Sequence, residues 1–197
     1  MYPPKRHQES DIEKLIEVIK TYPLATLISV NNESPLITHL PLIYKNDKLV
    51  GHIDIYNPQA EFLKDKKEVT VLFYGPQCYI SPSIYSTTQL PTWNFIRVHI
   101  KGNVTAINDK FALRKSLIEM TEFLEAPNQK YVLEPDNPRM EKYLNYIQLF
   151  EIEIDEWEGK FKLSQDKKTS DTLAAREALI KSHQESIRVF LDSVFPT

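Results

Sequence analysis

Hydrophobic residues in this chain recur mainly at every second position, and this alternation is typical of half-buried β-strands. Short polar turns separate most of the runs, such as the Lys-Asn-Asp-Lys sequence at residues 45–48. Strands that follow one another without long helices between them favour an antiparallel barrel over a parallel sheet. The pattern therefore predicts an α+β chain that is mainly β, with about six or seven strands. The clearest runs are residues 24–30, 36–44, 49–55, 69–75, 92–107 and 150–154.

Apolar residues at helical spacing flank these strands. The first such pattern starts with a capping box, Ser10 and Glu13. We expect a single domain over residues 1–197, with an N-terminal helix and a helical C-terminal extension over about residues 167–197. The helical patterns are residues 10–20, 57–63, 108–126, 140–147 and two C-terminal stretches, the last with Ile187, Phe190, Leu191 and Val194 on one stripe.

The segment from Tyr79 to Lys101 combines a polar, proline-containing loop with a long alternating strand. One side of the strand becomes apolar after a polar start, as in a strand that enters a core from its rim. The other side changes from large aromatics to cations. That side suits a flat aromatic ligand bearing an anion, or an aromatic-rich partner surface; the alternative is a solvated basic face. The two sides are Thr92, Asn94, Ile96, Val98, Ile100 and Trp93, Phe95, Arg97, His99, Lys101.

Charge and composition narrow the function classes. The formal net charge is −3, which argues against a protein that coats nucleic acid or an anionic membrane. We find no helix-turn-helix pattern and no window near the ~20 apolar residues of a membrane span. Cys78 is the lone cysteine, and the N-terminal segment lacks a secretory h-region. These features predict a cytoplasmic protein that does not bind DNA directly.

Glycine scarcity restricts how a nucleotide could be held. The chain has four glycines, none close to another, so it cannot form a Rossmann fingerprint or a P-loop. Side chains would have to hold any phosphate. In the segment GKFKLSQ, an extended backbone places Lys160, Lys162 and Ser164 on one face. This face is either an anion-binding strip or a solvated edge strand protected by lysines.

No residue pattern assigns a catalytic group or a metal site. His39, His52 and His99 fall on predicted strands, but their spacing is nonlocal and no HExxH or CxxC accompanies them. Ordinary hydrogen-bonded histidines are the favoured interpretation. The serines near Tyr85 lack the Gly-x-Ser-x-Gly elbow of a serine hydrolase.

Seven segments, taken together, resemble a known family, the PaiB-type FMN-binding negative transcriptional regulators of bacteria. The TWN and KLSQ segments carry most of the specificity, and the resemblance extends from residue 1 to about residue 180. The segments are MYPP (1–4), PLATLIS (23–29), THLPL (38–42), GHIDIYNP (51–58), FYGPQCYISPSIY (73–85), PTWNFIRVH (91–99) and GKFKLSQ (159–165).

The resemblance implies an FMN-binding split β-barrel related to pyridoxamine-phosphate oxidases, usually a homodimer with flavin at the subunit interface. The family commonly has an arginine at the position of Ile55 and an alanine at that of Asp54, so this chain has lost a cation and gained an acid there. The residues that the resemblance places at the cofactor, with Arg97 added as a possible phosphate partner, are His52, Asn57, Thr92, Trp93, Asn94, Arg97, His99, Lys160, Lys162, Ser164 and Gln165.

Three functions stay open at this point. The first is an FMN-binding homodimer that regulates gene expression indirectly, with part of the Trp93–Phe95 side covered by the partner. The second is a flavin-dependent oxidoreductase acting on a small molecule. The third is a haem-handling split barrel, for which the candidate axial ligands are His39, His52, His99 and His183.

Overall fold

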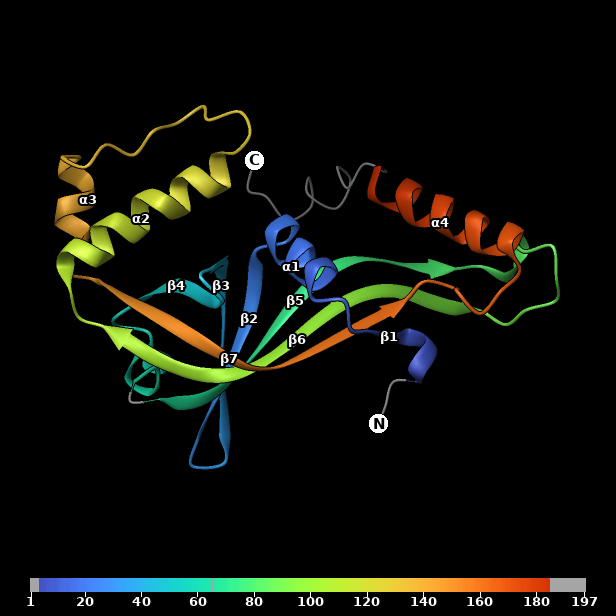
Figure 1. Cartoon of the computed structure of the whole chain (residues 1–197), viewed down its shortest axis with the longest axis horizontal. Helices are drawn as coiled ribbons and strands as arrows, with labels where there is room; N and C mark the ends of the chain where they lie inside the picture. Colours follow the sequence, from blue (N-terminus) through green and yellow to red (C-terminus); the bar gives the residue numbers. More distant parts are fainter. Residues whose placement is uncertain (1–3, 65, 185–197) are drawn as a thin grey trace, which may run out of the picture. The chain divides into compact units, whose positions relative to one another are not determined.

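The computed structural model describes residues 4–64 and 66–184 (Figure 1). Seven strands form one sheet in the order β1-β7-β4-β3-β2-β5-β6, and β6 also pairs with β7. That last pairing closes β2 to β7 into a ring. The fold is therefore mainly antiparallel β with flanking helices, as the sequence predicts. The strands are β1 Gln8–Glu9, β2 Leu24–Asn31, β3 Ser34–Lys45, β4 Lys48–Asp54, β5 Lys67–Ile80, β6 Thr92–Ile107 and β7 Ile147–Lys162.

The helices confirm most of the predicted patterns but correct three of their starts. The helix predicted at residues 140–147 runs from Pro138 to Tyr143, because Asn137 caps it and β7 begins at Ile147. The first helix is capped by Asp11, whose side chain accepts from the Glu13 amide at 3.1 Å, and not by Ser10. Asp109, and not Asn108, caps the helix after β6. In both cases the acid is the residue whose oxygen reaches the second helical amide. The helices are η1 Lys5–His7, α1 Ile12–Thr21, η2 Pro58–Phe62, η3 Pro82–Ile84, α2 Lys110–Glu125, α3 Pro138–Tyr143 and α4 Thr169–Gln184.

Two further findings concern the helices. The stripe predicted at residues 187–194 lies outside the described residues. None of the described helices combines the length and the apolar character needed to cross a membrane.

The chain divides into two compact units, and three strands contribute to both of them. Unit 1 takes its described residues from 1–9, 75–97 and 160–197, and unit 2 takes its own from 10–74 and 98–159. The boundaries fall inside β5 and β6 and near the end of β7. Whether both units unfold together, as a single domain would, stays a prediction.

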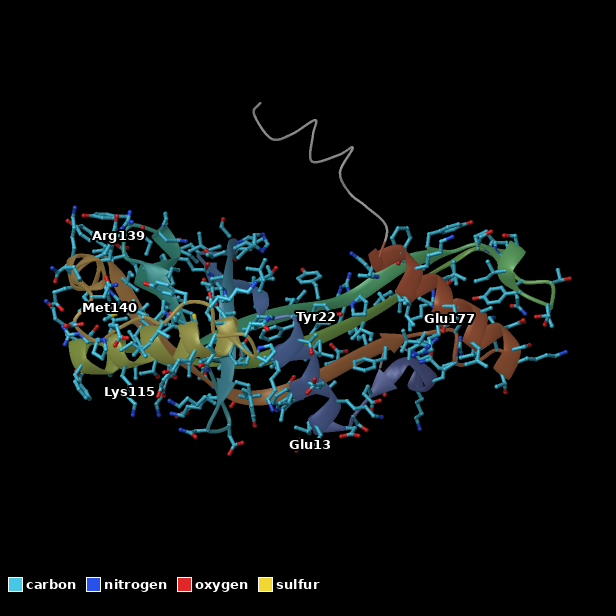
Figure 2. The ribbon with its side chains drawn as sticks, turned by 90° about the horizontal axis from the view of Figure 1, so that it is seen from above. Glu13, Tyr22, Lys115, Arg139, Met140 and Glu177 are labelled. Carbon is cyan, nitrogen blue, oxygen red and sulfur yellow. The ribbon has the colours of Figure 1, made fainter. Side chains whose placement is uncertain are left out.

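Unit 2 holds the closed barrel and its core. Fully buried side chains point inward from several strands, among them Leu27, Leu42 and Phe150. Each such side chain contributes about 1.5–3 kcal/mol when it leaves water. A second cluster joins α2 and α3 to β3, β4 and β7, and Met140 of α3 belongs to it (Figure 2).

Gly102 lies in the interior of the long strand β6. β6 runs without interruption from Thr92 to Ile107. A Cβ atom on Gly102 would lie 2.1 Å from the main-chain oxygen of Glu153. The glycine therefore permits the close approach of β6 to β7 that closes the barrel.

In unit 1, α4 packs against the C-terminal end of β5 (Figure 1). Cys78, Ile80 and Ala175 are buried together there. Burial raises the pKa of the Cys78 thiol, so this cysteine behaves as a packed apolar residue. The first turn of α4 also holds the loop before β6, since Asp171 accepts from the Ser86 amide at 2.7 Å and from the Thr87 hydroxyl at 2.6 Å.

Candidate functional site

The predicted alternation along β6 is confirmed. Asn94, Val98 and Ile100 are buried, whereas Trp93 keeps 50% of its surface exposed. Asn94 is thus a polar residue near the start of the core-facing side of β6, and its side-chain amide is buried. A buried amide needs hydrogen-bond partners.

A pocket of about 290 Å³ lies in unit 1, beside the start of β6. Three cations and one carboxylate line it, and its other polar groups include two hydroxyls. This combination suits an anion with several oxygen atoms. We call it the cationic pocket; its lining residues are Arg6, His7, Gln89, Leu90, Pro91, Thr92, Lys162, Ser164, Asp166 and Lys167.

The TWN and KLSQ segments meet in this pocket through side-chain hydrogen bonds. Lys162 Nζ donates to Thr92 Oγ1 at 2.6 Å. Asn94 Nδ2 donates to Ser164 Oγ at 3.0 Å, and the Tyr85 hydroxyl lies 2.8 Å from the same oxygen. Ser164 has a left-handed backbone, with φ of 60°. β7 thus ends at Lys162, and the turn directs Ser164 toward Asn94.

Other predicted residues of unit 1 lie outside the lining of the cationic pocket. Gln165 braces the backbone, because its Nε2 donates to the Arg6 carbonyl at 2.7 Å and its Oε1 accepts from the Leu163 amide at 2.7 Å. Lys160 does not line the pocket either.

Arg97 and Trp93 belong to the aromatic side of β6. The Arg97 guanidinium donates to the Gly75 carbonyl at 3.2 Å and lies 5.7 Å from the centre of the Phe95 ring. The rings of Trp93 and Tyr79 lie 6.4 Å apart, and both are about half exposed. This surface is aromatic, and Arg97 is bonded within β5 and β6.

His52, Asn57 and His99 lie in unit 2. His52 Nε2 lies 3.1 Å from Ser116 Oγ, and burial lowers the pKa of His52 to about 4. The imidazole is therefore neutral at neutral pH. Asn57 caps η2 by accepting from the Gln59 amide at 2.9 Å.

The third residue of this set, His99, has Nδ1 3.3 Å from the Glu158 carboxylate. His52 is paired with Leu149 in the register of β4 and β7. Glu158 lies nine residues further along β7, a length of up to about 30 Å for an extended strand. The structure does not bring His52 and His99 together.

Sequence reasoning missed six residues of the cationic pocket, namely Arg6, His7, Gln89, Leu90, Asp166 and Lys167. Burial, and then the charges of Arg6 and Lys162, lower the pKa of His7. Asp166 and Lys167 directly follow the KLSQ segment, and Arg6 closely follows MYPP. Extending each quoted segment by two or three residues would have found them.

The histidines do not gather into a metal site. Over residues 4–64 and 66–184, no three His, Cys, Asp or Glu side chains are grouped so that they could hold a metal ion.

Comparison with known families assigns the chain to a protein family. The family model described as "Putative FMN-binding domain" matches residues 1–156. The chain is a member of this family. It is also 31% identical to the "Protease synthase and sporulation protein PAI 2" of Bacillus subtilis (strain 168), over 91% of this chain and 89% of the relative. The resemblance noted from the sequence is confirmed.

Solved structures confirm the fold of this family member. The "FAD and Heme binding protein" of Mycobacterium smegmatis has a TM-score of 0.67 and 19% identity, covering 86% of this chain and 80% of that one. The "Flavocytochrome Anf3" of Azotobacter vinelandii has a TM-score of 0.64 and 17% identity, with 79% and 69% covered. The shared architecture is the split barrel.

Proposed function

We propose that this chain binds FMN and that the cationic pocket of unit 1 holds the phosphate. The observation that carries the proposal is the meeting of the TWN and KLSQ segments at Lys162, Thr92 and Ser164 in a pocket that also receives Arg6 and Lys167. Membership of a family described as FMN-binding supports FMN as the ligand. The chain has no clustered glycines to bind a phosphate through the backbone, and the side-chain cations and hydroxyls of the pocket can bind it instead.

The charges in the pocket favour a dianion. Lys167 Nζ lies 3.3 Å from Asp166, so one cation is already paired with a carboxylate. Lys162 is held by a neutral hydroxyl and has further protons to donate. Each charge-assisted hydrogen bond to a phosphate oxygen is worth about 1.5–3 kcal/mol. FMN would bring the electron-transfer chemistry, and the chain would bind and orient it.

Two lysines on one strand provide the test. Lys162→Ala should weaken FMN binding about tenfold or more, as measured by quenching of flavin fluorescence. Lys160→Ala is the matched control: it removes the same charge two positions away, from a side chain outside the pocket lining, and should change FMN affinity little. Riboflavin, which lacks the phosphate, should bind more weakly than FMN. Equal affinity for FMN and riboflavin would contradict the proposal.

We further propose a cytoplasmic homodimer in which a partner covers part of the Trp93–Phe95 side. The exposed rings of Trp93 and Tyr79 support this, because apolar patches of this kind mark contact surfaces. Light scattering at micromolar concentration should give twice the chain mass of 23.0 kDa. A monomeric mass would exclude this dimer.

The proposed role is regulation of gene expression without direct contact to DNA. The net charge of −3 and the absence of a helix-turn-helix pattern support an indirect route, through metabolism or a partner. Retention of promoter DNA at physiological salt, with a steep dependence on salt, would contradict it.

An oxidoreductase and a haem-binding protein are the second candidates. The names of the two structural relatives, a FAD and haem binding protein and a flavocytochrome, favour testing for haem as well as flavin. The absorbance spectrum of the purified protein distinguishes the classes, because a flavin and a haem absorb at different wavelengths. Turnover of a reductant by the flavin-loaded protein would favour the enzyme.

A further inference from the structure

A pocket of about 240 Å³ lies in unit 2 beside α2 and shares none of its lining residues with the cationic pocket. It is bounded by the turn between β3 and β4, by parts of β4 and β7, by the end of β6 and by one face of α2. Its volume lies just below the range of about 300–1,000 Å³ that is typical of pockets for drug-sized ligands. This pocket, which we call the α2 pocket, therefore suits a small molecule and not a nucleotide.

The local sequence brings charged side chains to the α2 pocket from two elements. Asn46 and Asp47 have left-handed backbones, with φ of 49° and 60°, as a two-residue hairpin turn requires. This turn places Lys45 and Lys48 opposite each other in the β3–β4 register. The lining residues of α2 recur at helical spacing and so share one face of the helix. They are Ala112, Lys115, Ser116 and Glu119.

The floor of the α2 pocket is apolar. Val50 of β4 and Leu149 of β7 are buried, and Ile107 and Ala112 are partly buried against the same cluster. This is the cluster that joins α2 and α3 to the barrel strands. The pocket is thus a place where that cluster meets solvent, and a hydrocarbon chain bound there would be stabilised by leaving water.

The charges of the α2 pocket are not balanced. Its lining contains three lysines and two glutamates. Lys48 is neutralised by two carboxylates of β7, at 2.9 Å and 3.7 Å from its Nζ atom. Lys45 and Lys115 (Figure 2) instead share the one carboxylate of Glu119, at 2.5 Å and 4.0 Å. The excess positive charge at this pair matches a ligand with a single negative charge.

Lys45 and Lys115 can both donate to a ligand while Glu119 stays in place. An ammonium group carries three N–H donors. Lys45 directs one of them to Glu119, and Lys115 Nζ is too far from that carboxylate for a hydrogen bond. Ser116 adds a buried hydroxyl, whose oxygen lies 3.1 Å from His52 Nε2. The polar part of the pocket therefore supplies several donors for a pair of ligand oxygen atoms.

We propose that the α2 pocket binds a small monocarboxylate with a short aliphatic chain. Lys45 and Lys115 bind the carboxylate, and the chain packs against Val50 and Leu149. A phosphate dianion fits this pocket less well, because the pocket has one unbalanced positive charge and an apolar floor. The proposal does not rest on FMN binding, since it uses no residue of the cationic pocket.

Hexanoate is the probe for the α2 pocket. Calorimetric titration of the full chain with hexanoate should show saturable binding, with a dissociation constant of roughly 1 mM. Each methylene added between butyrate and hexanoate should raise the affinity about fourfold, because the chain enters the apolar floor. Hexylamine, which has a similar chain and the opposite charge, should bind about tenfold more weakly than hexanoate or worse.

Two lysines of α2 provide a matched pair of variants. Lys115→Met removes a cation of the pocket and should weaken hexanoate binding about threefold, the effect expected for an exposed charge. Lys110→Met is the control, because Lys110 lies outside the pocket lining and donates to Asn145 Oδ1 at 2.7 Å. It should leave hexanoate affinity unchanged.

Ala112→Leu tests the floor of the pocket. Leucine is a good helix former, and its larger side chain would occupy space that the hydrocarbon chain needs. Hexanoate affinity should fall about tenfold or more, as expected if two methylenes no longer fit. Urea unfolding midpoints close to that of the unmodified chain establish that the variants are folded.

The proposal is overturned if hexanoate shows no saturable binding, or if hexylamine binds as tightly as hexanoate. It is also overturned if acetate and hexanoate have equal affinity, since the apolar floor would then contribute nothing. Equal affinity of Lys115→Met and Lys110→Met for hexanoate would contradict the role of Lys115. The series of chain lengths uses the unmodified protein, so it tests the pocket even if a substitution prevents folding.

Discussion

The partly buried imidazole of His52 makes a quantitative prediction about stability and pH. Burial lowers the pKa of His52 to about 4, whereas the ordinary value is 6.5. Below pH 6.5 the unfolded chain takes up a proton at this residue, but the folded chain resists it until the pH approaches 4. The folded state should therefore lose stability as the pH falls through this window, and above pH 6.5 the effect should vanish.

The size of the effect follows from the two pKa values. Between pH 7.5 and pH 4.5, proton uptake by the unfolded state should cost the fold about 2.5 kcal/mol at this one residue. Other groups titrate over the same range, so a variant that lacks only this imidazole is needed. His52→Gln keeps a polar side chain near the Ser116 hydroxyl, which lies 3.1 Å from the imidazole in the unmodified chain.

Urea unfolding at several pH values is the assay. Between pH 7.5 and pH 4.5, the unfolding free energy of the unmodified chain should fall by about 2.5 kcal/mol more than that of His52→Gln. The two curves should run parallel above pH 6.5. If they stay parallel down to pH 4.5, His52 is not held neutral by burial, and the reasoning fails.

Two further substitutions test other parts of the structure. Ile55→Arg restores the arginine common in the family. Because Ile55 is not among the residues that line the cationic pocket, FMN affinity in a fluorescence titration should stay within about twofold, and a tenfold gain would instead place the phosphate near Ile55. Gly102→Ala should lower the unfolding free energy by about 1–3 kcal/mol, because its Cβ would meet a main-chain oxygen. Gly51→Ala, which meets the side-chain ends of Leu42 and Phe150, should cost less in the same urea experiment.

Local periodicity predicted six of the seven strands, because a strand shows its own alternation; it missed β1 and found only residues 69–75 of β5 and 150–154 of β7. β6 was predicted with both ends correct, since one residue in two along it faces the core. Helix starts were less certain. Ser10 and Asp11 are both good caps in sequence, and the choice depends on which oxygen reaches an amide in three dimensions.

The candidate site was predicted only in part. Lys162 and Ser164 lie in the cationic pocket as the anion-strip interpretation expects, but Lys160 on the same strand does not. Arg6 lies more than 150 positions from Lys162 in the sequence, yet both line the pocket. A local sequence pattern cannot predict such a long-range contact. His52, assigned to the cofactor by its motif, is partly buried, and its Nε2 lies 3.1 Å from Ser116 Oγ of α2. A sequence motif can identify candidate site residues, but their contacts with residues distant in sequence determine whether they line the pocket.

The closure of the barrel limits how this protein can associate with others. In the ring from β2 to β7, every strand has a neighbour on both sides. The main-chain groups along the paired lengths are thus already used, and an extended peptide or a second copy cannot join them as an additional strand. Along those paired lengths, a partner must instead recognise the outward side chains. Association then depends on the shape and chemistry of those surfaces, and substitutions on them can change it without disturbing the sheet.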